Sequence, residues 1–155
     1  MEITKRIQEL ISGREFISIA TCNFHGRPNV APKFFLKSEN NFIYLVDYVI
    51  GATYKNLKIN PQVSMSLMDL DNLLGYQING TVEIIEKGKD YEGLLSEFQA
   101  KEISLSTKRI IEGLDRGKKH TSFEVGFSEK VAVFKVKMIE IVEIGLTGDV
   151  KREKV

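Results

Sequence analysis

The stretch Gly51-Ala-Thr-Tyr-Lys-Asn-Leu-Lys-Ile-Asn-Pro61 decides the fold, because it has the pattern of a short basic helix between two strands. Phe42-Ile-Tyr-Leu-Val46 precedes it and Val63-Ser-Met-Ser-Leu-Met68 follows it. Asn60 tolerates a left-handed cap and Pro61 cannot continue a helix, so the helix is predicted to end there. The chain therefore passes from one strand through a single short helix into the next strand.

Further strand patterns lie on both sides of this helix. Runs of β-branched and aromatic residues, separated by turn formers, predict strands at 15–21, 29–37, 42–47, 62–69, 74–85, 123–127, 131–137 and 139–144. Pro32 has no backbone N–H, so its nitrogen must face away from the hydrogen-bond ladder or lie at a bulge. Gly80 is a candidate for a kink in its strand. Most of these strands are joined by short turns, which favours antiparallel pairing.

Helical periodicity occurs at two other places. Apolar residues at helical spacing predict an amphipathic helix over 1–12, ended near Gly13. They return between 90 and 116, where the pattern predicts a helical insertion of two helices around a break near 104–106. The charged tail, 147–155, is predicted to be frayed.

A chain of 155 residues with 43% hydrophobic and 28% charged residues is expected to form one globular domain over 1–155. Short strands with segregated helices predict an α+β fold with an antiparallel sheet of six to seven strands closed into a barrel. The net charge of +1 and the absence of a long apolar run indicate neither a nucleic-acid nor a membrane partner. A single cysteine, Cys22, fits the reducing cytoplasm.

The beginning of the short helix is the first candidate site. Its first-turn backbone N–H groups, the Thr53 hydroxyl and the Lys55 ammonium form a combination that suits a phosphate, and Gly51 permits close approach. The alternative is that Thr53 caps the helix and Lys55 is simply solvated. Neither a P-loop nor a GxGxxG motif is present, so a nucleoside triphosphate or a dinucleotide is not indicated.

Ala31-Pro-Lys-Phe-Phe-Leu-Lys37 is the second candidate site. It is either an ordinary half-buried strand or a surface along which a ring lies, with Lys33 toward an electron-rich edge of that ring. Cys22, His25 and His120 have no metal-site spacing, and no catalytic residue or metal site is predicted from them.

In this order, the motifs resemble the FMN-binding split β-barrel family, whose best-known member is pyridoxamine 5′-phosphate oxidase. The resemblance covers about 16–86 and is carried by Ile19-Ala-Thr21 with Gly26-Arg-Pro28, and by Lys55-Asn-Leu57 with Asn60-Pro-Gln-Val63. It implies a homodimer with FMN at the subunit interface. Arginine and histidine counterparts for binding pyridoxal phosphate are not found, so oxidation of pyridoxamine phosphate is not predicted.

The resemblance also implies roles for individual residues. Pro32, Lys33 and Phe34 would lie along the isoalloxazine ring, and Val46 and Asp47 would approach the ring or the ribityl chain. Thr53 and Lys55 would hold the phosphate, and Gln77 would reach the flavin from the partner subunit. The expected function is an FMN-dependent oxidoreductase of unassigned substrate. A non-catalytic electron carrier or sensor, or a barrel that binds haem or F420, are the alternatives.

Overall fold

The computed structural model describes residues 2–48, 50–116 and 130–155. The strand predicted at 123–127 and His120 lie outside these residues. The chain forms two compact units, of which one comprises 1–86 with 130–155 and the other comprises 87–129. Within the described residues the helices and strands are α1 (Glu2–Ser12), β1 (Phe16–Cys22), β2 (Pro28–Glu39), β3 (Phe42–Asp47), α2 (Ala52–Ile59), β4 (Gln62–Asp69), β5 (Leu74–Ile85), α3 (Lys89–Asp115), β6 (Ala132–Ile144) and β7 (Val150–Lys154).

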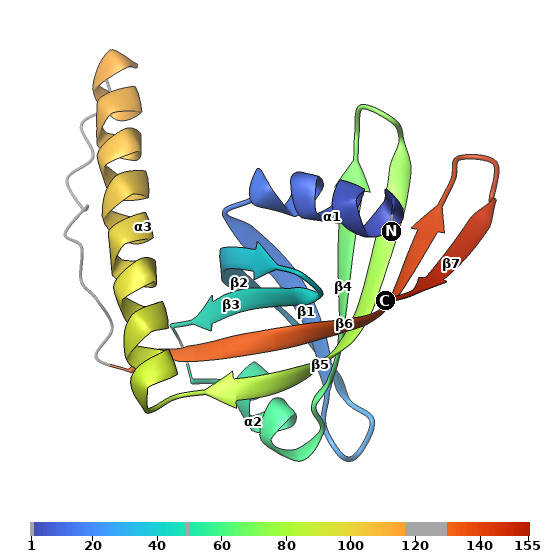
Figure 1. Cartoon of the computed structure of the whole chain (residues 1–155), viewed down its shortest axis with the longest axis horizontal. Helices are drawn as coiled ribbons and strands as arrows, with labels where there is room; N and C mark the ends of the chain where they lie inside the picture. The colour runs from blue at the N-terminus through green and yellow to red at the C-terminus, as the bar shows by residue number, and fades with distance from the viewer. Residues whose placement is uncertain (1, 49, 117–129) are drawn as a thin grey trace. The chain divides into compact units, whose positions relative to one another are not determined.

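The first unit is a closed antiparallel barrel. Its strands follow the order β3-β2-β1-β4-β5-β6-β7, and an additional pairing of β3 with β6 closes β1 to β6 into a ring (Figure 1). Strand β7 extends the sheet beyond β6. This architecture confirms the predicted α+β fold with six to seven antiparallel strands.

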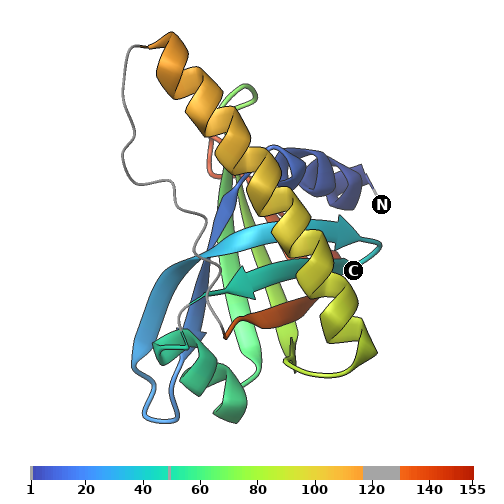
Figure 2. The same ribbon diagram turned by 90° about the vertical axis from the view of Figure 1, so that its left-hand side faces the viewer.

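The barrel interior is the hydrophobic core. Alternation along β1 and β4 turns Ile17, Ile19, Val63 and Met65 inward, and each is at most 5% exposed. Helix α1 lies at one end of the barrel and α2 at the opposite end (Figures 1 and 2). Each adds apolar side chains to the core, so both ends of the barrel interior are covered.

A register shift between Asn79 and Gly80 interrupts the pairing of β5 with β6. A Cβ atom on Gly80 would lie 2.4 Å from the backbone oxygen of Lys137, so only glycine fits at this point. The position where the sequence suggested a kink is therefore a close approach of two backbones, beside a bulge in β6.

Strand β6 is one continuous strand, although the sequence predicted two. Asn79 pairs with Glu140 and Gly80 with Met138, so the extra residue, Ile139, forms a bulge within β6 and the strand continues across the expected gap. The tail is not wholly frayed, because β7 pairs with β6 along its length. Charged side chains also match across this pair, with Arg152 Nη1 3.3 Å from Glu140 Oε2.

The second unit contains α3, which corresponds to the helical insertion predicted over 90–116. It is a single helix of 27 residues, without the break predicted near 104–106. Serine has only a modest cost within a helix, and the Thr107 hydroxyl donates to the Ile103 carbonyl at 2.9 Å without interrupting the helix. Among the described helices, none combines the length and the apolar character needed to cross a membrane.

Candidate functional site

The beginning of α2 is open to an anion. The helix starts after Gly51, which makes no side-chain capping hydrogen bond, and its first turn contains no acidic residue. The Lys55 N–H closes the first helical bond to the Gly51 carbonyl at 3.1 Å, which leaves the earlier N–H groups outside the helical ladder. Lys55 is exposed, and helical side chains point back toward the N-terminus. Backbone donors and one ammonium therefore serve the same end of the helix.

Thr53 is not the cap of this helix, which corrects one of the two interpretations of its role. Its side chain lies inward, and the residue is only 2% exposed. The Thr53 hydroxyl oxygen accepts a hydrogen bond from Asn29 Nδ2 at 3.1 Å. Because a hydroxyl can donate and accept at once, this bond still leaves the Thr53 proton for another acceptor.

Polar side chains fix α2 against the barrel. Asn56 Nδ2 donates to the Thr21 hydroxyl of β1 at 3.0 Å, and both residues are buried. On the other side, Glu86 accepts from Tyr54 at 2.5 Å and from Lys58 at 2.9 Å. The hydrogen bond to Glu86 is the main cause that raises the pKa of Lys58. A helix of eight residues is thus held in one position mainly by side-chain contacts.

Lys33 and Asp47 form a buried ion pair. The Lys33 Nζ lies 2.7 Å from Asp47 Oδ1, and the two residues are 7% and 1% exposed. Lys33 pairs in register with Ile17, whose side chain belongs to the core, so the ammonium points to the inner side of β2. The predicted contact of Lys33 with a flavin stays a prediction, and any such contact would form beside the Asp47 carboxylate.

The neighbours of Lys33 face the other way. Pro32 is exposed, while Phe34 and its register partner Val46 are buried on the outer side of the sheet. The Phe34 ring meets Phe16 edge-on with centroids 5.9 Å apart, and Tyr48 with centroids 6.1 Å apart. The structure therefore brings Pro32, Phe34 and Val46 together on one face.

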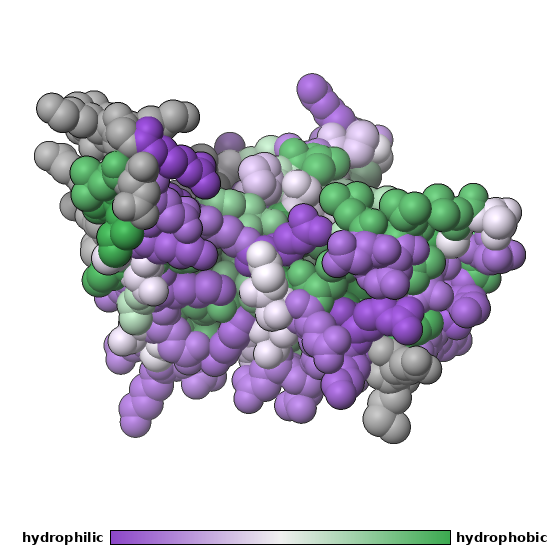
Figure 3. Space-filling view, turned by 90° about the horizontal axis from the view of Figure 1, so that it is seen from above, coloured by the Kyte–Doolittle hydropathy of each residue, from purple (hydrophilic) through white to green (hydrophobic). Residues whose placement is uncertain are grey.

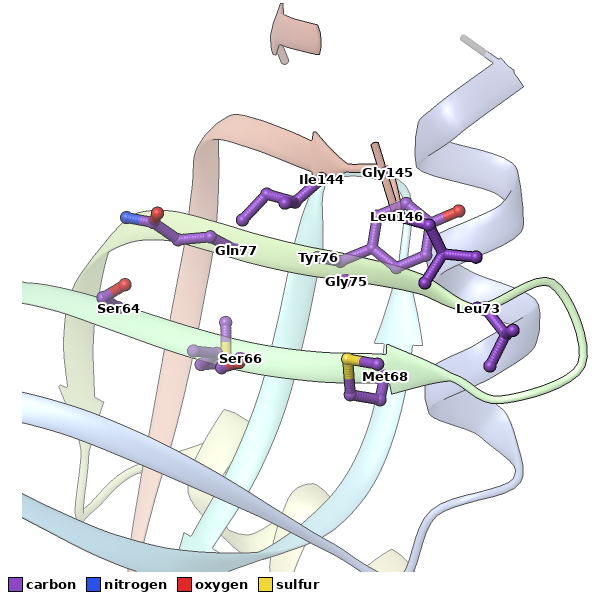
Figure 4. A pocket seen from close by; sticks show the side chains of 11 residues that line it. Ser64, Ser66, Met68, Leu73, Gly75, Tyr76, Gln77, Ile144, Gly145 and Leu146 are labelled. Atoms are coloured by element: carbon purple, nitrogen blue, oxygen red, sulfur yellow. The ribbon is translucent and has the colours of Figure 1, made fainter. Parts of the chain in front are cut away.

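Gln77 lies in a separate groove on the outer face of β4, β5 and the end of β6 (Figure 4). The groove has a volume of about 410 Å³, and Gln77 is the only one of the predicted site residues among the described residues that line it. Apolar side chains are also exposed nearby, since Leu73 is 47% and Leu146 is 75% exposed. Figure 3 shows an apolar area at the end of the molecule that carries the β4–β5 and β6–β7 hairpins.

Sequence reasoning missed three asparagines that organise these sites: Asn29, Asn56 and Asn79. Asparagine is depleted in strands, so its presence within the strand patterns of β2 and β5 was the available signal. Their partners could not be found without the fold, because each hydrogen bond to Thr53, Thr21 or Glu140 joins residues distant in the chain.

This chain forms a closed antiparallel barrel, and a short helix without a side-chain N-cap follows its third strand. These features define the class of split β-barrel proteins. The family model described as "Pyridoxamine 5'-phosphate oxidase" matches residues 3–123. The chain belongs to this family.

Solved structures of two other proteins have a similar fold. A pyridoxinephosphate oxidase family protein from Clostridium acetobutylicum, related to general stress protein 26, superposes with a TM-score of 0.70 at 15% identity, covering 99% of this chain and 95% of the other. A pyridoxamine 5'-phosphate oxidase-related, FMN binding protein from Nostoc punctiforme gives a TM-score of 0.57 at 12% identity, with coverages of 99% and 94%. At these identities the likeness concerns the fold alone.

The heme oxygenase HutZ of Vibrio cholerae is 32% identical over 63 residues. This match covers 41% of the chain and 35% of HutZ, so the chain spans about a third of the curated relative that it matches.

Proposed function

We propose that this protein is an FMN-binding flavoprotein and acts as an oxidoreductase on a substrate that is not yet assigned. The observation that carries the proposal is the open beginning of α2, with exposed Lys55 beside first-turn N–H groups. This donor set fits a phosphate monoester. Membership of the pyridoxamine 5'-phosphate oxidase family and the similar fold of a protein described as FMN binding support the choice of flavin.

In this proposal Lys55 and the first-turn amides hold the phosphate, and the Thr53 hydroxyl, oriented by Asn29, supplies a further donor. Val46 and Asp47 stand where β3 leads toward α2, which suits contact with the ribityl chain. Exposed Pro32 provides the outer surface for the ring, with Phe34 buried beside it on the same face and Lys33 on the inner side of the strand. When bound, FMN supplies the redox chemistry, while the protein orients it and shields it from water.

We also propose that two copies of the chain share the site as a homodimer, with Gln77 contributed across the subunit interface. The exposed apolar side chains beside the Gln77 groove support this arrangement. As part of the same proposal, we assign the protein to the cytoplasm, and the free cysteine Cys22 supports a reducing compartment.

The direct test is to purify the full chain, denature it and identify any released cofactor by absorbance and mass. FMN in the supernatant, or stoichiometric binding of added FMN by the colourless protein, is the expected result. Failure of both would refute the proposal. Steady-state turnover of NADH or NADPH with an acceptor then separates an enzyme from a non-catalytic electron carrier.

Haem is the second candidate cofactor, because the curated relative HutZ is described as a heme oxygenase. In the described part of the chain the only histidine is His25, at the β1–β2 hairpin, where its ring centroid lies 3.8 Å from that of Phe24. The same extraction distinguishes the cofactors, since haem has a Soret band and flavin does not. A deazaflavin such as F420 is separated from FMN by its mass.

A further inference from the structure

A network of hydrogen-bonded side chains crosses four strands on the outer face of the barrel. Asn79 is its centre, because its Nδ2 donates to Glu140 Oε2 at 3.0 Å, while its Oδ1 accepts from Ser64 Oγ at 2.9 Å and from Gln77 Nε2 at 3.0 Å. Arg152 of β7 donates to the same Glu140 oxygen at 3.3 Å. We call these residues, Ser64, Gln77, Asn79, Glu140 and Arg152, the amide relay.

The relay has a defined polarity. An ionised carboxylate only accepts hydrogen bonds, so Glu140 requires the NH2 group of Asn79 to face it. The Asn79 carbonyl oxygen is thereby directed at Gln77, so Gln77 must donate a hydrogen bond to it through its own NH2 group. The Gln77 carbonyl oxygen Oε1 is left as an acceptor, and no hydrogen bond reaches it from the described residues.

The backbone contributes to this arrangement. The pair Asn79–Glu140 lies directly beside the bulge at Ile139 of β6, and bulges re-aim the side chains beside them. Because Gly80 alone permits the close approach of β5 to Lys137 of β6, the same contact sets the position of Asn79 relative to Glu140.

Gln77 stands at the polar end of the groove shown in Figure 4, near Ser64 and Ser66, whereas Met68, Leu73 and Leu146 make the other end apolar. One N–H of the Gln77 amide is used by Asn79, so the second N–H and Oε1 remain for a ligand. A donor beside an acceptor in one plane complements a ligand edge that carries a carbonyl beside an N–H.

We propose that Asn79 and Glu140 are positioning residues that fix the polarity of the Gln77 amide, so that Gln77 selects a planar ligand with an imide edge. This inference rests on the proposed function, because the pyrimidine ring of a flavin carries an N3–H between two carbonyl groups. In the proposed homodimer, Gln77 of one subunit reads this edge of the flavin bound by the other.

The test compares the affinity of the full-length protein for FMN with that for N3-methyl-FMN, which lacks the N–H donor. Wild type is expected to bind FMN about tenfold more tightly than N3-methyl-FMN, because the methylated flavin loses one well-placed hydrogen bond. The double variant Glu140→Gln with Arg152→Met keeps the shape at 140, removes the Arg152 donor that would fix the new amide, and lets this amide donate or accept, so the amides of Asn79 and Gln77 are free to flip. In this variant the preference is expected to fall to about threefold or less.

Two further variants complete the design. Gln77→Met is expected to abolish the preference for FMN, and adding it to the Glu140→Gln, Arg152→Met double variant should cause no further change in that preference. Ser66→Ala, which alters the same groove outside the amide relay, is expected to keep the full preference. Thermal unfolding of each variant verifies that it is folded.

The outcomes are distinguishable. Equal binding of the two flavins by wild type would overturn the role of Gln77 and leave the proposed function standing. A full preference in the Glu140→Gln, Arg152→Met double variant would overturn the relay alone. Failure of wild type to bind any flavin would refute the proposed function together with this inference.

Discussion

Gly80 lies at a point of the barrel that has no room for a side chain. A methyl group there would meet the backbone oxygen of Lys137 at 2.4 Å and Val136 Cγ1 at 3.0 Å. Gly80→Ala is therefore expected to lower the free energy of unfolding by about 2 kcal/mol or more, since a backbone must shift to accept it. Urea unfolding followed by circular dichroism measures this loss.

Gly93 provides the matched control, because a Cβ atom there meets nothing within 4 Å and the residue lies within α3. Gly93→Ala is expected to leave stability unchanged or to raise it by up to about 1 kcal/mol. Similar losses in both variants would contradict the steric argument at Gly80.

The Lys33–Asp47 pair makes a second prediction at the level of single residues. Lys33→Met leaves the Asp47 carboxylate buried without its ammonium partner, and the loss in unfolding free energy is expected to be about 3–5 kcal/mol. The double variant Lys33→Met with Asp47→Leu removes both charges and should recover most of that loss. Chemical denaturation of both variants checks the prediction, and a double variant as unstable as the single one would argue against it.

Residue-level chemistry was only partly readable from the sequence. Thr53, Lys55 and Gly51 were correctly placed at the beginning of a short helix, because turn and cap preferences are local. The inward direction of Lys33 and its pairing with Asp47 required the register of β1, β2 and β3, which depends on contacts distant in sequence.

At the scale of elements, α2 is the part that the proposed site depends on. Lys55→Ala removes an exposed ammonium near the beginning of this helix. We expect it to weaken FMN binding by about three- to tenfold and to change the unfolding free energy by less than about 0.5 kcal/mol. Fluorescence titration with FMN and a urea melt measure the two quantities.

Lys58→Ala is the control, because Lys58 lies in the last turn of α2 and is bound to Glu86. Its removal should leave FMN affinity unchanged. If both variants weakened FMN binding equally, only the general positive charge of α2 would matter. Unchanged FMN affinity in Lys55→Ala would contradict the proposed role of Lys55.

Strand and helix positions in the barrel followed well from periodicity, as β3, β4 and β5 lie within one residue of their predictions. The prediction of an element failed where a partner distant in the sequence decides whether the element forms. Strand β7 has a charged sequence that forms a strand only because β6 offers matching charges and an edge to pair with. In α3, two serines suggested a break that the helix does not have.

At the scale of the whole molecule, α1 is joined to the barrel by a partly buried polar cluster. Arg6 Nη1 lies 3.2 Å from Glu143 Oε2, and the Tyr76 hydroxyl donates to the same oxygen at 3.1 Å. Tyr76 is 1% exposed, and burial is the main cause that raises its pKa above the usual value, with the hydrogen bond to Glu143 acting in the same direction.

Because of this cluster, the free energy of unfolding is expected to fall at alkaline pH. The folded state favours the neutral phenol, so its contribution is complete below the unfolded pKa of about 10 and is lost as pH rises through the higher folded pKa. Thermal unfolding from pH 8 to 11 should show a decline in wild type above about pH 10 that is smaller in Tyr76→Phe. Parallel declines in the two proteins would contradict this assignment.

The measurement that tests the central claim most directly compares FMN with riboflavin, which differs only by the phosphate. If the phosphate binds at the beginning of α2, the full-length protein should bind FMN at least about tenfold more tightly, and Lys55→Ala should narrow that ratio. Equal affinity for FMN and riboflavin in wild type would contradict a phosphate site at α2.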